Sequence, residues 1–223
     1  MRRELLAEGL GTAILLYVVV GSGIAAQELA TDPGLGLLAH ALAVGLGLGA
    51  LIAMLQSVSG AHFNPSVTLA FWRIRSIDRA EAVGYGLTQV VGGIAGVALA
   101  NWSFGDPVLT LSSTERSGLG LIVAEIVATF VLVLVILALV RTGRPQAVPA
   151  AVGAWVAAAV FATSSTGFAN PAVTLSRLFT DSYTGIAPRS VGAFVTAQLL
   201  AGLLAALAAI VMFPDREIES ATV

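Results

Sequence analysis

Six apolar stretches dominate this sequence, and each is long enough to cross a lipid bilayer. A membrane-spanning helix needs about 20 mostly apolar residues, because each residue advances about 1.5 Å across a hydrocarbon core of about 30 Å. The stretches that meet this requirement are Leu5–Ala26, Gly34–Gln56, Ala80–Ala100, Gly118–Val140, Ala147–Ser165 and Ser190–Phe213. The first carries Glu8 and is too long for a cleavable signal peptide, so we expect it to remain as a helix. These features predict an all-α membrane protein forming one domain, residues 1–223.

The composition excludes several function classes. Only 11% of the residues are charged and 57% are hydrophobic, whereas soluble domains carry roughly 25% charged residues. The absence of cysteine excludes disulfides, thiolate catalysis and cysteine-ligated zinc. A net charge of −2 offers no basic surface for nucleic acid. We therefore expect no enzyme activity, no metal or cofactor, and the lipid bilayer as a partner.

The arginines, which are the only basic residues besides histidine, predict the orientation in the membrane. With six crossings, both termini lie on the same side. That side holds Arg2, Arg3, Arg73, Arg75, Arg79, Arg141, Arg144 and Arg216, whereas the other holds Arg116, Arg177 and Arg189. The positive-inside rule then places both termini in the cytoplasm of a multi-pass protein of the cell membrane.

The two halves of the chain repeat each other. Ala7–Thr12 parallels Ala124–Thr129, Asn64–Leu69 parallels Asn170–Leu175, and Gln89 in the third span corresponds to Gln198 in the sixth. The repeats cover about 1–105 and 115–215. Because each half contains an odd number of spans, the second copy enters the membrane from the opposite side, which makes an inverted repeat.

Each half also contains one Asn-Pro motif that predicts the start of a short helix. Asn is a favoured N-cap and Pro is favoured at the first helical position. The run from Asn64 to Arg73 gives about 15 Å of helix, which is half a bilayer. The residues before each motif are too apolar for exposed loops, and irregular backbone at membrane depth must be covered by protein or line an aqueous cavity. We expect both half-helices to point their positive N-termini at each other near the midplane; two ordinary surface turns are the alternative.

At these residues the chain resembles the aquaporin and aquaglyceroporin (major intrinsic protein) family. The resemblance rests on Ser59–Thr68, on Gly167–Thr174 and on the paired Glu and Gln residues, and it extends over essentially the whole chain. It implies six helices, two re-entrant half-helices and a pore in each subunit of a homotetramer. Pore selectivity in such channels follows from pore diameter, lining hydrogen-bonding groups and electrostatic barriers.

The resemblance also implies roles for individual residues. The pore constriction would comprise Asn64, Pro65, Ser66, Asn170, Pro171 and Ala172, with the two asparagines donating to the permeating molecule. The re-entrant loops would be braced by Glu8, Glu125, Gln89 and Gln198; a proton-carrying role for the glutamates is the alternative. His62 would lie near the cytoplasmic mouth, and His40 is interpreted as an interfacial residue rather than a gate.

The sequence departs from the family at the outer selectivity filter. Ser66 replaces the usual Ala of the first motif, a small change. Water and glycerol channels of the family usually have Arg directly after the second motif, where this chain has Val173. A count without gaps assigns the other filter positions to Val44, Ala158 and Gly167, with Phe168 as an alternative to Gly167. The predicted filter is wide, apolar and uncharged.

A wide uncharged filter favours a passive channel for small uncharged solutes such as glycerol, urea or metalloid hydroxides. Bacterial family members with Val at this position are associated with arsenical transport, which makes arsenite the favoured solute, with water as a possible further one. A water-selective aquaporin, a secondary transporter and a structural junction protein are the alternatives. Arg177 lies one helical turn beyond Val173, so it either reaches the pore mouth or extends to lipid headgroups.

Overall fold

The computed structural model describes residues 1–214 and contains helices without strands over that range. The helices long and apolar enough to span a membrane are α1 (Arg2–Leu29), α2 (Pro33–Ser59), α4 (Arg79–Ser103), α5 (Leu119–Arg141), α6 (Val148–Ala162, preceded by the 3₁₀ turn η1, Pro145–Ala147) and α8 (Pro188–Met212). Two short helices complete the fold: α3 (Pro65–Arg73) and α7 (Pro171–Ser176), the latter followed by the 3₁₀ turn η2 (Arg177–Phe179). The predicted all-α membrane fold with six spanning helices is confirmed.

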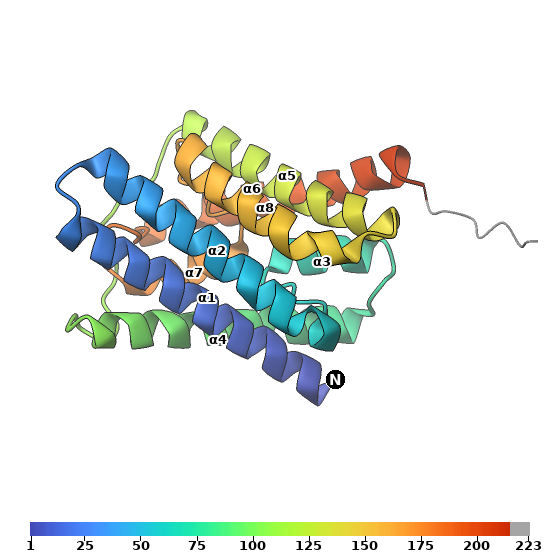
Figure 1. Cartoon of the computed structure of the whole chain (residues 1–223), viewed down its shortest axis with the longest axis horizontal. Coiled ribbons are helices and arrows are strands. Elements are labelled where there is room, and N and C mark those ends of the chain that lie inside the picture. The colour runs from blue at the N-terminus through green and yellow to red at the C-terminus, as the bar shows by residue number, and fades with distance from the viewer. Residues whose placement is uncertain (215–223) are drawn as a thin grey trace, which may run out of the picture.

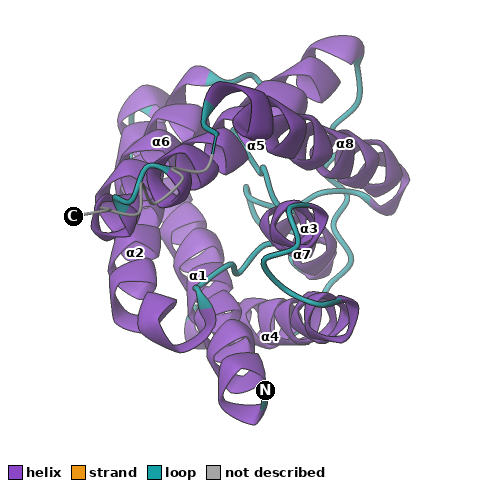
Figure 2. Cartoon of the chain, turned by 90° about the vertical axis from the view of Figure 1, so that its right-hand side faces the viewer, coloured by secondary structure: helices purple, strands orange, loops and turns teal. Residues whose placement is uncertain are grey.

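The two short helices lie between α4 and α8, on the opposite side of the bundle from α2 and α6 (Figure 2). Viewed along the long axis of the molecule, α3 and α7 lie one behind the other, bordered by α4, α5 and α8 (Figure 2). In the side view, α3 occupies the end that contains the N-terminus and α7 the opposite end (Figure 1). Neither short helix therefore crosses the whole bundle.

The helix starts follow the capping residues of the sequence. Asp32 accepts a hydrogen bond from the Leu35 N–H, and Asp78 accepts one from the Glu81 N–H, both at 2.8 Å. Asn64 and Asn170 cap α3 and α7 in the same way, each followed by proline at the first helical position. An N-cap side chain satisfies one of the N–H groups that a helix start leaves unpaired.

Glycines set the closest helix contacts. A Cβ atom added to Gly92 on α4 would lie 2.1 Å from the Gly9 carbonyl oxygen on α1, and one added to Gly96 would lie 2.0 Å from the Ala13 carbonyl oxygen. A Cβ on Gly153 of α6 would lie 2.6 Å from the Gly45 carbonyl oxygen on α2. These backbones touch directly, as expected where small residues mediate packing between membrane helices.

The arginines separate by end of the molecule, as the sequence suggested. The terminus-bearing end holds the start of α1, the connection from α3 to α4, and the connection from α5 to α6 (Figure 1). Arg116 and Arg189 lie at the other end, in the segments that precede α5 and open α8. Arg216, which the sequence count included, lies outside the described residues.

We expect Gly92→Ala to destabilise the protein by about 1–3 kcal/mol, because the added methyl group would collide with the α1 backbone. Gly86 on the same helix is the matched control, since a Cβ there would meet nothing within 4 Å. Thermal unfolding of the purified variants in detergent measures both effects. Equal midpoints for Gly92→Ala and Gly86→Ala would contradict the packing described here.

Candidate functional site

An elongated cavity runs along the inside of the bundle and has about 790 Å³ of empty space, counting its open ends. It extends from His62 and Val148 at the terminus-bearing end to His40 and Arg177 at the opposite end. One wall is apolar and comes from the spanning helices: Leu15, Val19, Val44, Leu48, Ile52, Leu132, Ile136, Val148, Val152, Val156 and Val160. The other wall is the irregular backbone before α3 and α7, together with their N-caps: residues 60–64 and 166–170.

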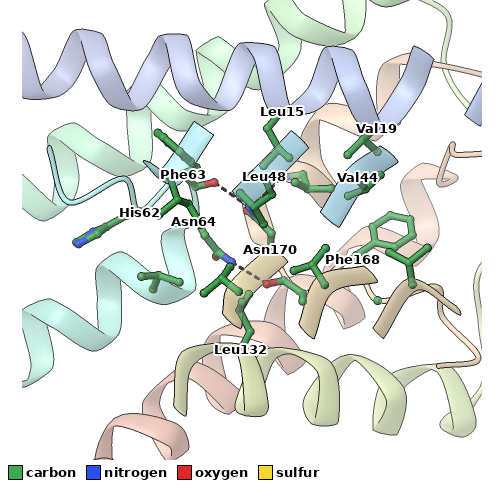
Figure 3. Close-up of a pocket in the computed structure, with 18 of the residues that line it drawn as sticks. Leu15, Val19, Val44, Leu48, His62, Phe63, Asn64, Leu132, Phe168 and Asn170 are labelled. Carbon is green, nitrogen blue, oxygen red and sulfur yellow. Dashed lines mark hydrogen bonds between the residues drawn. The ribbon is translucent and has the colours of Figure 1, made fainter. Parts of the chain in front are cut away.

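The two Asn-Pro motifs meet in the middle of this cavity, as predicted. Asn64 Nδ2 donates to the Ala169 carbonyl oxygen and Asn170 Nδ2 donates to the Phe63 carbonyl oxygen, each at 2.8 Å. Figure 3 shows both bonds crossing between the motifs. These reciprocal bonds fix the start of one half-helix against the start of the other.

Each asparagine keeps one donor for a molecule in the cavity. Asn64 Oδ1 accepts from the Ser66 N–H at 2.8 Å, and Asn170 Oδ1 accepts from the Ala172 N–H at 2.9 Å. The amide NH₂ group carries two hydrogens, and only one of them is used in the reciprocal bond. The second hydrogen, beside the positive end of a half-helix, is suited to bind an acceptor oxygen of a permeating molecule.

Glu8 holds the first irregular segment against α1. Its Oε1 accepts from Ser59 Oγ at 2.6 Å and from the His62 N–H at 2.9 Å. Its Oε2 accepts from the Phe63 N–H at 2.7 Å and from Gln89 Nε2 at 2.8 Å. All these partners are donors, so the buried carboxylate meets the hydrogen-bonding needs of backbone that water cannot reach.

Glu125 does the same for the second segment. Its oxygens accept from the N–H groups of Phe168 at 3.0 Å and Ala169 at 2.9 Å, and also from Gln198 Nε2. Gln198 Nε2 donates further to Thr174 Oγ1 of α7 at 2.8 Å. The equivalent Gln89 donates to Thr68 Oγ1 of α3 at 3.1 Å. Each glutamine is thus hydrogen-bonded both to a glutamate and to a half-helix.

These bonds orient the backbone of both segments. Phe63 and Ala169, each just before an asparagine, have left-handed φ values of 48° and 50°, a conformation that costs about 1–2 kcal/mol per residue. A trans peptide points its N–H and C=O in opposite directions. Because the N–H groups of Phe63 and Phe168 face the glutamates, the carbonyls of His62 and Gly167 face away from them, on the side of the cavity that these residues line.

The structure corrects one position of the predicted filter. Val44, Gly167 and Val173 line the cavity, and Phe168 lines it together with Gly167. Ala158 is exposed on the outside of α6, so its assignment to the filter is wrong. Residues advance about 100° each around a helix, so Ala158 faces away from Val156. Val156 and Val160 face the cavity instead.

Both histidines line the cavity, at opposite ends. His62 packs on Phe71, with ring centroids 4.6 Å apart, and its Nδ1 lies 3.1 Å from Thr68 Oγ1. His40 is also buried and its Nδ1 lies 2.8 Å from Ser22 Oγ. The interpretation of His40 as an interfacial residue missed its place in the cavity wall.

Arg177 also lines the cavity and is only 3% exposed, which contradicts an extension to lipid headgroups. Its guanidinium carbon lies 3.4 Å from the centre of the Phe168 ring. The sequence showed that Arg177 follows Val173 by one turn, but the contact with Phe168 arises only in the folded chain.

We expect Glu8→Gln to destabilise the protein by about 1–3 kcal/mol for each donor left without an acceptor, because the introduced NH₂ group would face donors. The control is Glu28→Gln on the same helix, where the side chain is exposed and the change falls within about 0.5 kcal/mol. Thermal unfolding in detergent distinguishes the variants. A Glu8→Gln midpoint equal to wild type would show that the carboxylate does not brace the segment.

Comparison with known proteins shows which family this chain resembles. A profile of the major intrinsic protein family matches residues 1–169. Aquaglyceroporin AqpS of Rhizobium meliloti (strain 1021) is 44% identical over 208 residues, which is 93% of this chain and 88% of the relative. Aquaporin Z of Photorhabdus laumondii is 32% identical over 169 residues, 69% of this chain and 72% of the relative.

The fold also matches an X-ray structure, that of the aquaglyceroporin from Plasmodium falciparum. The match has a TM-score of 0.75 and covers 92% of this chain and 94% of the other, at 22% sequence identity. Family profile, relatives and fold agree with the paired half-helices around a cavity. This chain is a member of the major intrinsic protein family, a multi-pass aquaporin-type channel for small solutes.

Proposed function

We propose that this protein is a passive channel for small uncharged solutes that are wider than water. The candidate solutes are metalloid hydroxides such as arsenite, together with glycerol, urea and water. The observation that carries the proposal is Val173, an uncharged and short side chain that lines the cavity at the position following the second motif. The similarity to a protein named aquaglyceroporin supports the same class of solute.

The two walls of the cavity suit solutes with hydroxyl groups on one side and carbon or a metalloid on the other. Carbonyls and the Asn64 and Asn170 amides offer hydrogen bonds along one wall, while leucine, isoleucine and valine side chains form the opposite wall. A solute that gives up its hydration shell regains hydrogen bonds from the polar wall only. This arrangement binds neutral polar molecules weakly, which favours fast passage.

The buried acidic groups argue against an ion-coupled transporter. Among the described residues, the buried carboxylates are Glu8 and Glu125, and both are engaged by backbone and glutamine donors. Neither is among the residues that line the cavity. Coupling to an ion gradient requires a site at the transport path that binds that ion.

We further propose that the protein is a homotetramer in the cell membrane with both termini in the cytoplasm. The arginine-rich end carries the N-terminus, which supports this orientation by the positive-inside rule. The similar hydrogen bonding around Glu8 and Glu125 supports an inverted repeat of about 1–105 and 115–215. Exposed leucines on the outer faces of α2 and α8, such as Leu46 and Leu204, suit contact with lipid or with neighbouring subunits.

We expect Val173→Arg to narrow the range of conducted solutes, because a long cationic side chain would fill the apolar filter. Stopped-flow light scattering of proteoliposomes should show glycerol, urea, boric acid and arsenous acid entering faster than in protein-free vesicles. In Val173→Arg the largest solutes should slow by about tenfold or more, relative to water. Ala158→Leu is the matched control, since Ala158 lies outside the cavity and its replacement should change nothing.

Two results would contradict the proposal. Wild-type fluxes of all these solutes equal to those of protein-free vesicles would exclude a channel for them. Fluxes that follow an imposed sodium or pH gradient would show a coupled transporter instead.

A further inference from the structure

The channel carries a buried cation at the end opposite the termini. Arg177 follows the second half-helix, in η2, and is 3% exposed while lining the cavity. Its guanidinium carbon lies 3.4 Å from the centre of the Phe168 ring, within the range of a cation–π contact. Phe168 itself packs edge-on against Phe194, with centroids 5.3 Å apart. Figure 3 shows Phe168 at this end of the cavity, beyond Asn170 and near Val44.

A second arginine approaches the same ring. The Arg116 guanidinium carbon lies 5.0 Å from the Phe168 centroid. Arg116 Nη2 donates to the Tyr183 carbonyl oxygen at 3.0 Å and its Nε donates to the Gly185 carbonyl oxygen at 2.8 Å. Arg177 Nε donates to the Thr184 carbonyl oxygen between them. Three consecutive carbonyls therefore hold two guanidinium groups at the mouth.

The two arginines differ in which of their side-chain nitrogens are bonded to carbonyls. Arg116 uses both Nε and a terminal nitrogen on carbonyls, whereas Arg177 uses Nε. Neither has a carboxylate partner among residues 1–214: the ion pair at this end joins Arg189 to Glu115. Because Arg177 lines the cavity and its Nε is bonded to the Thr184 carbonyl, its terminal NH₂ groups are the donors that a solute can meet.

We propose that Arg177 is the selectivity cation of this channel, placed one helical turn outside Val173. Its terminal nitrogens donate to acceptor oxygens of an entering neutral solute, and its charge excludes cations from the mouth. Val173 leaves the filter uncharged. The width of the filter and the charge at the mouth of the cavity are therefore set by two different residues at different depths. This inference rests on the proposed passive channel and names the residue that makes it selective for uncharged, oxygen-bearing solutes.

The physical argument for cation exclusion is Coulombic. Two like charges a few ångströms apart repel strongly inside a protein, where the effective dielectric constant is about 20 rather than 80. A cation passing Arg177 meets this repulsion, whereas a neutral solute does not. The Glu125 carboxylate, which accepts from the Phe168 N–H, acts on Arg177 in the opposite sense but forms no ion pair with it. Arg116, whose guanidinium carbon lies 5.0 Å from the Phe168 centroid, adds to the same positive potential.

The test measures sodium entry and neutral solute flux in the same proteoliposomes, the former with a trapped sodium-sensitive dye. Arg177→Gln should raise sodium entry by about tenfold or more and alter the ratio of glycerol to water flux, because both the charge and the guanidinium donors are lost. Arg177→Lys keeps the charge and should still exclude sodium, but its single ammonium should alter the ratio of glycerol to water flux. Arg189→Gln is the control, because Arg189 is exposed and paired with Glu115 outside the cavity.

A rescue variant makes the inference specific. Arg177→Gln combined with Val173→Arg returns a cation to the pore and should restore sodium exclusion. Unchanged sodium entry and unchanged glycerol-to-water ratio in Arg177→Gln would overturn the inference while leaving the proposed channel intact. If Arg177→Gln does not fold, the ratio of glycerol to water flux in Arg177→Lys is the test. A ratio equal to that of the wild type overturns the inference. Absence of neutral flux in the wild type would instead refute the proposed function.

Discussion

Two breaks in the helical backbone at membrane depth are the constraint on which this structure depends. In a spanning helix every backbone group is satisfied within the helix, but the segments before Asn64 and Asn170 leave N–H groups without helical partners. Inside a bilayer each such group costs several kcal/mol. Glu8 and Glu125 supply acceptors for these N–H groups. The carboxylates are therefore part of the backbone architecture.

The same bonds create the polar wall of the channel. Once the glutamates hold the N–H groups, planarity of the peptide directs the paired carbonyls to the other side. The reciprocal bonds of the two asparagines then place both helix starts in contact at the middle of the cavity. The opposite wall needs no polar groups and is formed by side chains that would suit any membrane helix. A selective path thus arises from two short irregular segments within an otherwise ordinary bundle.

The sequence predicted those features that depend on local chemistry. Asparagine followed by proline is a helix start in any context, and a nine-residue helix is too short to cross the bilayer. The correspondence of Glu8 with Glu125 and of Gln89 with Gln198 was visible as a repeat, and the structure joins the glutamate and the glutamine of each half by a hydrogen bond. Helix spans were predicted to within a few residues for the same reason, since apolar length depends on local composition.

Features that depend on tertiary geometry were predicted less well. A count without gaps assumed a fixed spacing between α6 and the second motif. An error of two residues rotates a side chain by about 200° around the helix, and this moved the filter position to Ala158, which is exposed on the outside of α6. Arg177 was ambiguous because an arginine near a membrane end is usually solvated by headgroups. Its place was decided by the Phe168 ring and by the Thr184 carbonyl, which belong to two different loops.

The position of Arg177 outside the filter separates the residue that sets the charge of the channel from the residue that sets its width. An arginine within the filter narrows the path and repels cations with the same side chain, so neither property can change alone. Here the short and uncharged Val173 lines the cavity, and the guanidinium carbon of Arg177 lies 3.4 Å from the centre of the Phe168 ring at the cavity wall. The ring and the 183–185 carbonyls keep the charge at the wall without neutralising it. A channel built this way can admit larger neutral solutes and still present a positive mouth to cations.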